Sequence, residues 1–167
     1  VDPYHYRHRL TMPKLVLNAA GDQFFLPDSS KFYWDKLRGE NYLRYVPNGD
    51  HGLGRTDATE SIIAFYSLIV AGKKPPTFQW TEDEDGTLQV LVKDKPQVVR
   101  LWQAHNPEAR DFRVETLGRK YTSTIVKPDK NGLYRTDVEK PEKGWTAYFL
   151  ELTYDVGGPA ALKLTTH

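Results

Sequence analysis

The sequence predicts a two-part chain, an α/β part followed by an all-β part. Residues 1–76 alternate apolar strand-like runs with helix-like segments, whereas residues 77–167 form short strand-like runs separated by turn residues. Between them, the Lys-Lys-Pro-Pro run at 73–76 cannot continue a helix and indicates a linker. We therefore expect a βαβα domain piece over 1–76 and a β-sandwich domain of immunoglobulin or fibronectin type over 77–167.

The first expected strand and helix lie within residues 14–39. Residues 14–18 contain the apolar run Leu15-Val16-Leu17, which is typical of a strand buried on both faces of a parallel sheet. After a loop, Asp28 or Ser29 can cap a helix that runs to about Arg38, and Gly39 stands where a helix commonly ends.

The second strand and helix repeat this order. Residues 42–46 form another strand-like run, and a loop of turn residues follows at 47–52. Asp57 with Glu60 three positions later resembles a capping box, and Gly72 can end the helix. Apolar side chains recur along this helix at helical spacing, at Ile62, Ile63, Tyr66, Ile69 and Val70.

Residues 77–167 favour a β-sandwich. Asp85-Gly86 is a strong hairpin signal, and Asn131-Gly132 predicts another tight turn. We expect strands at 78–81, 87–92, 98–102, 121–126, 145–154 and 161–164, with further short strands between them.

Composition excludes several function classes. Lys and Arg number 23 against 22 Asp and Glu, so the chain lacks the basic excess of a simple nucleic-acid binder. It has no cysteine, which excludes disulfides, zinc–thiolate sites, iron–sulfur clusters and thiol nucleophiles. Apolar runs are too short for a membrane span, and the sequence opens on Val1 without a signal peptide. We expect an excised or processed piece of a longer protein that needs no cofactor and no metal.

Asp22 and His51 are the candidate catalytic residues. Each follows a predicted parallel strand, and in open α/β sheets catalytic groups gather just beyond the carboxyl ends of the strands. A carboxylate that accepts from one imidazole nitrogen fixes the tautomer and stabilises the imidazolium formed during proton transfer. The α/β-hydrolase order is serine, then acid, then histidine, and this chain holds an acid and a histidine in that order.

The stretch from "MPKLVLNAAGDQFFLPD" to "YVPNGDHGL" is similar to the PhoPQ-activated pathogenicity-related protein family, an α/β-hydrolase-like group, over nearly the whole chain. The resemblance implies that Asp22 is the triad acid and His51 the triad base. No Gly-x-Ser-x-Gly motif is present, so the nucleophilic serine is expected upstream, outside this chain. The resemblance also implies a secreted or periplasmic setting, but no particular substrate.

Two other carboxylates compete for the role of acid. Asp28 can serve instead of Asp22, although a helix cap is its simpler interpretation. Asp50 is adjacent to His51 and is either a turn residue or the partner that orients the ring.

Weaker candidates have structural alternatives. His5 and His8 could share a metal if helical, and Arg7 and Arg9 could hold an anion, but an amphipathic lead-in to the first strand is the simpler interpretation. Residues 83–86 resemble part of a calcium loop without its closing acid, so a hairpin turn is favoured. Trp80, Trp102 and Trp145 could stack a sugar, although aromatic residues of a sandwich are usually core.

Two functions follow from these observations. The first is the C-terminal portion of a serine hydrolase that acts on a small ester or peptide substrate, inactive without its serine. The second is a non-catalytic binding or interaction module derived from a hydrolase. Because two strands and two helices cannot cover both faces of a sheet, we expect a partner at the strand of residues 15–18, either the upstream part of the same hydrolase or a second chain.

Overall fold

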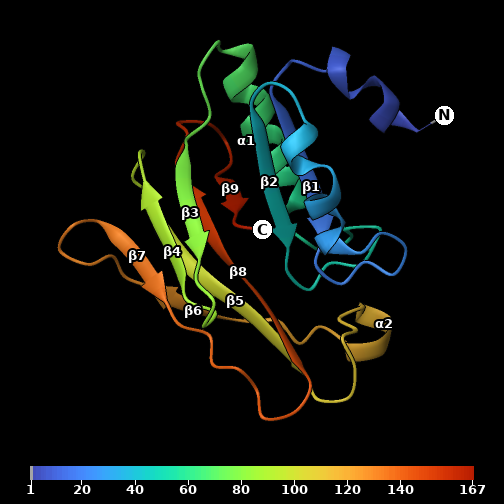
Figure 1. The fold of residues 1–167 in the computed structure, drawn as a ribbon. Helices are drawn as coiled ribbons and strands as arrows, with labels where there is room; N and C mark the ends of the chain where they lie inside the picture. Colours follow the sequence, from blue (N-terminus) through green and yellow to red (C-terminus); the bar gives the residue numbers. More distant parts are fainter. Residues whose placement is uncertain (1) are drawn as a thin grey trace.

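The structure is a computed structural model that describes residues 2–167 (Figure 1). The α/β part contains η1 (Pro3–Arg9), β1 (Lys14–Ala19), η2 (Pro27–Phe32), η3 (Trp34–Lys36), β2 (Asn41–Val46) and α1 (Ala58–Val70). The β-rich part contains β3 (Phe78–Glu82), β4 (Leu88–Val92), β5 (Val98–Asn106), α2 (Val114–Leu117), β6 (Thr122–Val126), β7 (Leu133–Thr136), β8 (Trp145–Tyr154) and β9 (Leu162–Thr165).

The strands form three sheets, as expected for a mixed α/β and all-β chain. Strands β1 and β2 pair in parallel, and their last residues, Ala19 and Val46, stand opposite each other. Two antiparallel sheets make up the rest, with strand orders β3-β4-β7 and β6-β5-β8-β9. The hydrolase ancestry of the first sheet and the immunoglobulin or fibronectin type of the other two stay predictions.

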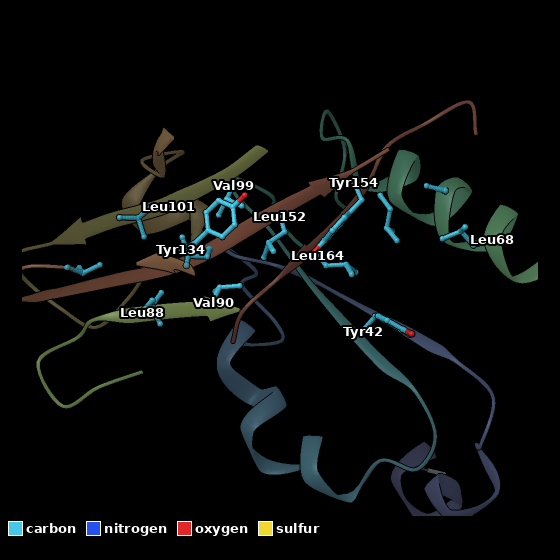
Figure 2. Close-up of a cluster of buried hydrophobic side chains, with 14 residues drawn as sticks. Tyr42, Leu68, Leu88, Val90, Val99, Leu101, Tyr134, Leu152, Tyr154 and Leu164 are labelled. Atoms are coloured by element: carbon cyan, nitrogen blue, oxygen red, sulfur yellow. The ribbon is translucent and has the colours of Figure 1, made fainter. Parts of the chain in front are cut away.

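Most of the core lies between the two antiparallel sheets. Leu88 and Val90 of β4 face Leu152 of β8 and Leu164 of β9 in one apolar cluster (Figure 2). Tyr42 of β2 belongs to the same cluster, as do Ala64 and Leu68 of α1. The α/β part and the β-rich part therefore share a continuous core across the linker at 73–76.

Hydrogen bonds also join the two parts. The backbone N–H of Tyr45, in β2, donates to the Thr165 hydroxyl of β9 at 2.9 Å. Phe149 of β8 packs with Leu43 and Tyr45 in a second apolar cluster on the other face of the four-stranded sheet. Strand β2 thus lies beside β9, the edge strand of the four-stranded sheet, and α1 packs against β9 and β1.

The expected burial of β1 on both faces is wrong. Residues 14–18 are only half-buried, whereas β2 is buried from Tyr42 to Val46. The reason lies in position, because β2 lies between β1 and β9, whereas β1 is the outer strand and pairs with no other strand of residues 2–167.

The two expected helices are only partly confirmed. The segment after Pro27 forms two short 3-10 helices, η2 and η3, instead of one α-helix to Arg38. Helix α1 forms and ends as expected, with Gly72 at a φ of 66°. However, α1 buries Ala58, Ser61, Ala64 and Leu68, so its larger apolar side chains point outward, namely Ile62, Ile63, Tyr66, Ile69 and Val70.

The turn predictions of the β-rich part are confirmed. Gly86 has a φ of 86° in the β3–β4 hairpin, and Gly132 has a φ of 81° before β7. These values lie in the left-handed region, where glycine is free of steric cost. No helix within residues 2–167 has the length and apolar character needed to cross a membrane.

Candidate functional site

Asp22 and His51 meet at the carboxyl end of the parallel pair. The His51 ring nitrogen Nδ1 lies 3.0 Å from Asp22 Oδ2 and 3.2 Å from Oδ1. The register explains this contact, because β1 and β2 end level with each other and each strand is followed at once by the loop that carries one of the two residues. The distance is the one expected between the two side chains if they act as a pair.

Asp22 is held as an ionised carboxylate. It is 7% exposed, and its Oδ1 accepts hydrogen bonds from the backbone N–H groups of Phe24 (2.7 Å) and Phe25 (3.0 Å). Burial alone would raise the pKa of Asp22, but these two N–H groups and the His51 ring outweigh it and hold the pKa below its ordinary value.

His51 combines a fixed ring with an accessible edge. Its side chain is 43% exposed, and its backbone N–H donates to Gln23 Oε1 at 3.2 Å. The Phe24 and Phe25 rings flank the imidazole at centroid distances of 5.0 and 5.4 Å. Phe24 and Phe25 are themselves about 70% exposed, so they border the imidazole without burying it.

The arrangement is suited to proton transfer. An ionised carboxylate only accepts hydrogen bonds, so Asp22 fixes the tautomer of neutral His51 that carries its proton on Nδ1. Within residues 2–167, no hydrogen bond engages the other nitrogen, Nε2. Nε2 is therefore the atom that can take a proton from a hydroxyl and return it to a leaving group.

The loop that carries His51 is strained. Asn48, Leu53 and Arg55 have φ values of 58°, 52° and 60°, and they are the non-glycine residues of the described chain with positive φ. For a leucine this conformation costs on the order of 1 kcal/mol or more. Backbone strain of this kind persists only where surrounding contacts enforce it, and it is common at functional sites.

Neither competing carboxylate contacts the histidine. Asp28 forms ion pairs with Lys31 at 3.2 Å and Arg110 at 2.6 Å. Asp50 pairs with Arg119 at 3.0 Å. Asp28 also caps no helix through its side chain, so its alternative interpretation as a cap is wrong.

The remaining candidates lie apart from Asp22 and His51 in the structure. His5 and His8 lie in η1, and no cluster of three or more metal-ligating side chains occurs in residues 2–167. The guanidinium of Arg7 lies 4.0 Å from the Tyr4 ring centroid. Gly86 N donates to Asp83 O, as in a hairpin turn.

The three tryptophans differ in environment. Trp80 packs against the main core and Trp102 against the second cluster. Trp145 is about half exposed at the start of β8.

Several side chains that support the site were not anticipated. Asn48 and Arg119 hold the loop of His51 through contacts with residues more than 70 positions apart in the sequence. Gly49 had a local signal, as a turn glycine, but nothing in the sequence indicated its contact with Gly21, whose N–H donates to Gly49 O at 3.0 Å.

Comparisons with known proteins agree with the motifs at this site. A family model described as PhoPQ-activated pathogenicity-related protein matches residues 1–113, which include Asp22 and His51. Autocrine proliferation repressor protein A of Dictyostelium discoideum is 37% identical over 177 residues, covering 92% of this chain. The chain spans 36% of the length of that relative. No solved structure matches the chain. The family match covers more than half of the sequence, and the chain belongs to the PhoPQ-activated pathogenicity-related protein family.

Proposed function

We propose that this chain is the part of a serine hydrolase that supplies the acid and the histidine of a catalytic triad. The observation that carries the proposal is the contact of Asp22 with His51 Nδ1, at the carboxyl end of two parallel strands. The strained loop around His51 and the low pKa of Asp22 add support, because both are features of catalytic sites.

The proposed reaction is acyl transfer to water on a small ester or peptide substrate. Asp22 orients the imidazole and stabilises its charged form, while Nε2 of His51 accepts the proton of the serine hydroxyl and later returns it to the leaving group. The nucleophilic serine belongs to a part of the protein outside these 167 residues, which contain no Gly-x-Ser-x-Gly motif. The reaction as proposed involves neither a cofactor nor a metal.

Hydrolysis of p-nitrophenyl esters tests the proposal in the full-length protein. We expect turnover there, a loss of about 10³-fold or more for His51→Ala, and no turnover from the 167-residue chain alone. The control is His105→Ala, because His105 is an exposed residue of β5 whose ring is hydrogen-bonded to Thr146 and to no other side chain of residues 2–167. Full activity of His51→Ala, or hydrolysis by the isolated chain, would overturn the proposal.

The exposed apolar surface of the α/β part supports a partner for this region. The outer edge of β1 has no strand beside it within residues 2–167, and the outward face of α1 carries Ile62, Ile63 and Tyr66. Bare strand edges and large apolar patches favour association. The proposed partner is another part of the same protein, or a second chain, that adds a strand to β1 and covers α1.

A non-catalytic interaction module is the second candidate. The observation that favours it is the name of the relative, which describes an autocrine repressor of proliferation and no hydrolytic activity. An autocrine factor acts from outside the cell, which also supports the proposal of a secreted or periplasmic protein. If the full-length protein binds cells or another protein equally well with His51→Ala and hydrolyses no ester, this second function replaces the first.

A further inference from the structure

Residues 110–121, which connect β5 to β6 and include α2, contact both loops of the candidate site. In Figure 1 this segment lies next to the ends of β1 and β2, although it belongs to the β-rich part. We call it the brace. Its residues are 59 or more positions away from His51 in the sequence, so only the tertiary fold brings them to the site.

The brace grips the His51 loop through Asn48. The Asn48 amide donates from Nδ2 to Tyr121 O and accepts at Oδ1 from Tyr121 N, both at 2.9 Å. This pair of hydrogen bonds imitates the pairing of two strands and leaves the amide one orientation. Asn48 has a φ of 58°, in the left-handed region that asparagine tolerates better than most residues, so the amide binds the brace from a backbone conformation that few other side chains would allow.

Arg119 makes a second attachment to the same loop. Its guanidinium donates to the backbone carbonyl of Asn48 through Nη1 and to Asp50 Oδ2 through Nη2 at 3.0 Å. Asp50 immediately precedes His51. Because a guanidinium is a rigid planar fork, its two bonds fix the spacing between these points of the loop.

The brace also holds the turn that leads to Asp22. Val114 N donates to Gly21 O at 3.0 Å, and Gly21 N donates to Gly49 O at the same distance. A Cβ at Gly21 would lie 2.6 Å from Val114 Cγ2, so the contact between the turn and α2 leaves no free space. The Asp22 turn, the His51 loop and the brace are therefore linked in one hydrogen-bonded cluster.

We propose that the brace sets the geometry between Asp22 and His51, with Asn48 and Arg119 as positioning residues. The catalytic meaning of this role rests on the hydrolase function proposed above, whereas the positioning itself does not. Two hydrogen bonds outside the brace, from Gly21 N to Gly49 O and from His51 N to Gln23 Oε1, join the His51 loop to the Asp22 turn. The brace adds the contacts that fix both segments against the β-rich part. The β-rich part thereby contributes to the site without contacting the reacting atoms.

The test uses Asn48→Gly and Arg119→Met in the full-length protein. Glycine adopts a φ of 58° without strain. Asn48→Gly therefore removes the two side-chain hydrogen bonds to Tyr121 and leaves the backbone conformation available. Arg119→Met removes the fork and keeps most of the apolar stem. Asn131→Gly and Arg135→Met are matched controls, because Asn131 lies in the turn before β7 and Arg135, within residues 2–167, forms an ion pair with Asp137 alone.

The first readout is the imidazole of His51, observed by NMR with ¹⁵N-labelled histidine and assigned with His51→Gln. The parent protein should show a Nδ1–H proton that exchanges slowly because it is bonded to Asp22. Both positioning variants should lose this resonance and should take up deuterium faster at residues 19–25 and 47–53, while both controls retain the parent behaviour. Retention of the resonance and of slow exchange in both positioning variants would overturn the proposal.

The second readout separates this proposal from the hydrolase function. If the parent hydrolyses esters, kcat should fall by about tenfold to a hundredfold in the positioning variants with little change of KM. If the parent has no activity but the resonance behaves as expected, the positioning role of the brace is supported and the proposed hydrolase function is wrong. If kcat is unchanged while the resonance is lost, positioning by the brace has no catalytic role and that part of the proposal is wrong.

Discussion

The guanidinium of Arg44 donates to the carboxylate of Asp57, the N-cap residue of helix α1. Arg44 lies in the middle of β2 and is fully buried, and it also donates to Ser61 Oγ and to the carbonyl of Asp57. The expected capping box is therefore wrong, because the Asp57 side chain makes no bond to the first turn of α1. The Lys163 ammonium of β9 binds the same carboxylate at 2.5 Å.

This network should make a large contribution to stability. We expect Arg44→Ala to lower the free energy of unfolding by about 2–5 kcal/mol, because the substitution leaves a cavity and removes a fully buried side chain that donates to Asp57 and Ser61. Urea unfolding measures it. Lys143→Ala, which breaks an exposed pair with Glu108, should cost less than about 1 kcal/mol and serves as the control. Equal costs for the two variants would contradict the role of the buried network.

Asp57 should also make the free energy of unfolding depend on pH. Burial would raise its pKa, but the Lys163 hydrogen bond and the charges of Arg44 and Lys163 hold the pKa below the ordinary value of 3.8. A depressed pKa in the folded state adds stability above the ordinary value, and this stability is lost as the pH falls through the folded pKa. The stability difference between the parent and Asp57→Asn should therefore be largest near neutral pH and shrink below about pH 4. Urea unfolding across this range measures it, and a difference that grows with acid would contradict it.

Gly21 should not tolerate a larger residue. In Gly21→Ala the new Cβ would lie 2.6 Å from Val114 Cγ2 and 3.0 Å from Gly49 O. We expect a loss of about 1–3 kcal/mol in thermal or urea unfolding, because the turn and α2 must move apart. The matched control is Gly158→Ala, since a Cβ at Gly158 meets nothing within 4 Å. Adding Val114→Ala should recover only part of the loss, because the contact with Gly49 O stays.

The two faces of α1 should respond differently to the proposed partner. Tyr66 is 67% exposed, so Tyr66→Glu should change the stability of the 167-residue chain by less than about 0.5 kcal/mol. In the full-length protein the same substitution should destabilise clearly, because the partner would bury a carboxylate there. Leu68 is 6% exposed, and Leu68→Ala should cost about 2–5 kcal/mol in both forms. A Tyr66→Glu variant that is neutral in the full-length protein would contradict coverage of this face.

Much of the fold is predictable from local pattern. Strands β1 and β2 lie within a residue of their expected bounds, and the hairpin at Asp85-Gly86 forms because glycine admits the required φ. The placement of Asp22 and His51 was predictable for the same kind of reason, since parallel strands of similar length end at one edge of the sheet. These features depend on hydrophobic periodicity and turn residues, which short stretches of sequence show, and on the general geometry of parallel sheets.

The burial of α1 and the attachments of the site were decided by the tertiary structure. The amphipathic pattern of α1 identifies an apolar face but not what covers it, and here the small residues Ala58, Ser61 and Ala64 pack inward because β9 and β1 approach closely. The Asp57 side chain binds Arg44 and does not cap α1, because a buried guanidinium attracts a carboxylate more strongly than the N–H groups of the first turn do. Asn48, Arg119 and Gly21 support the site through partners distant in the chain, and such contacts leave no local pattern. Local sequence pattern therefore identifies the acid and the base, whereas contacts between distant residues fix how the two are held together.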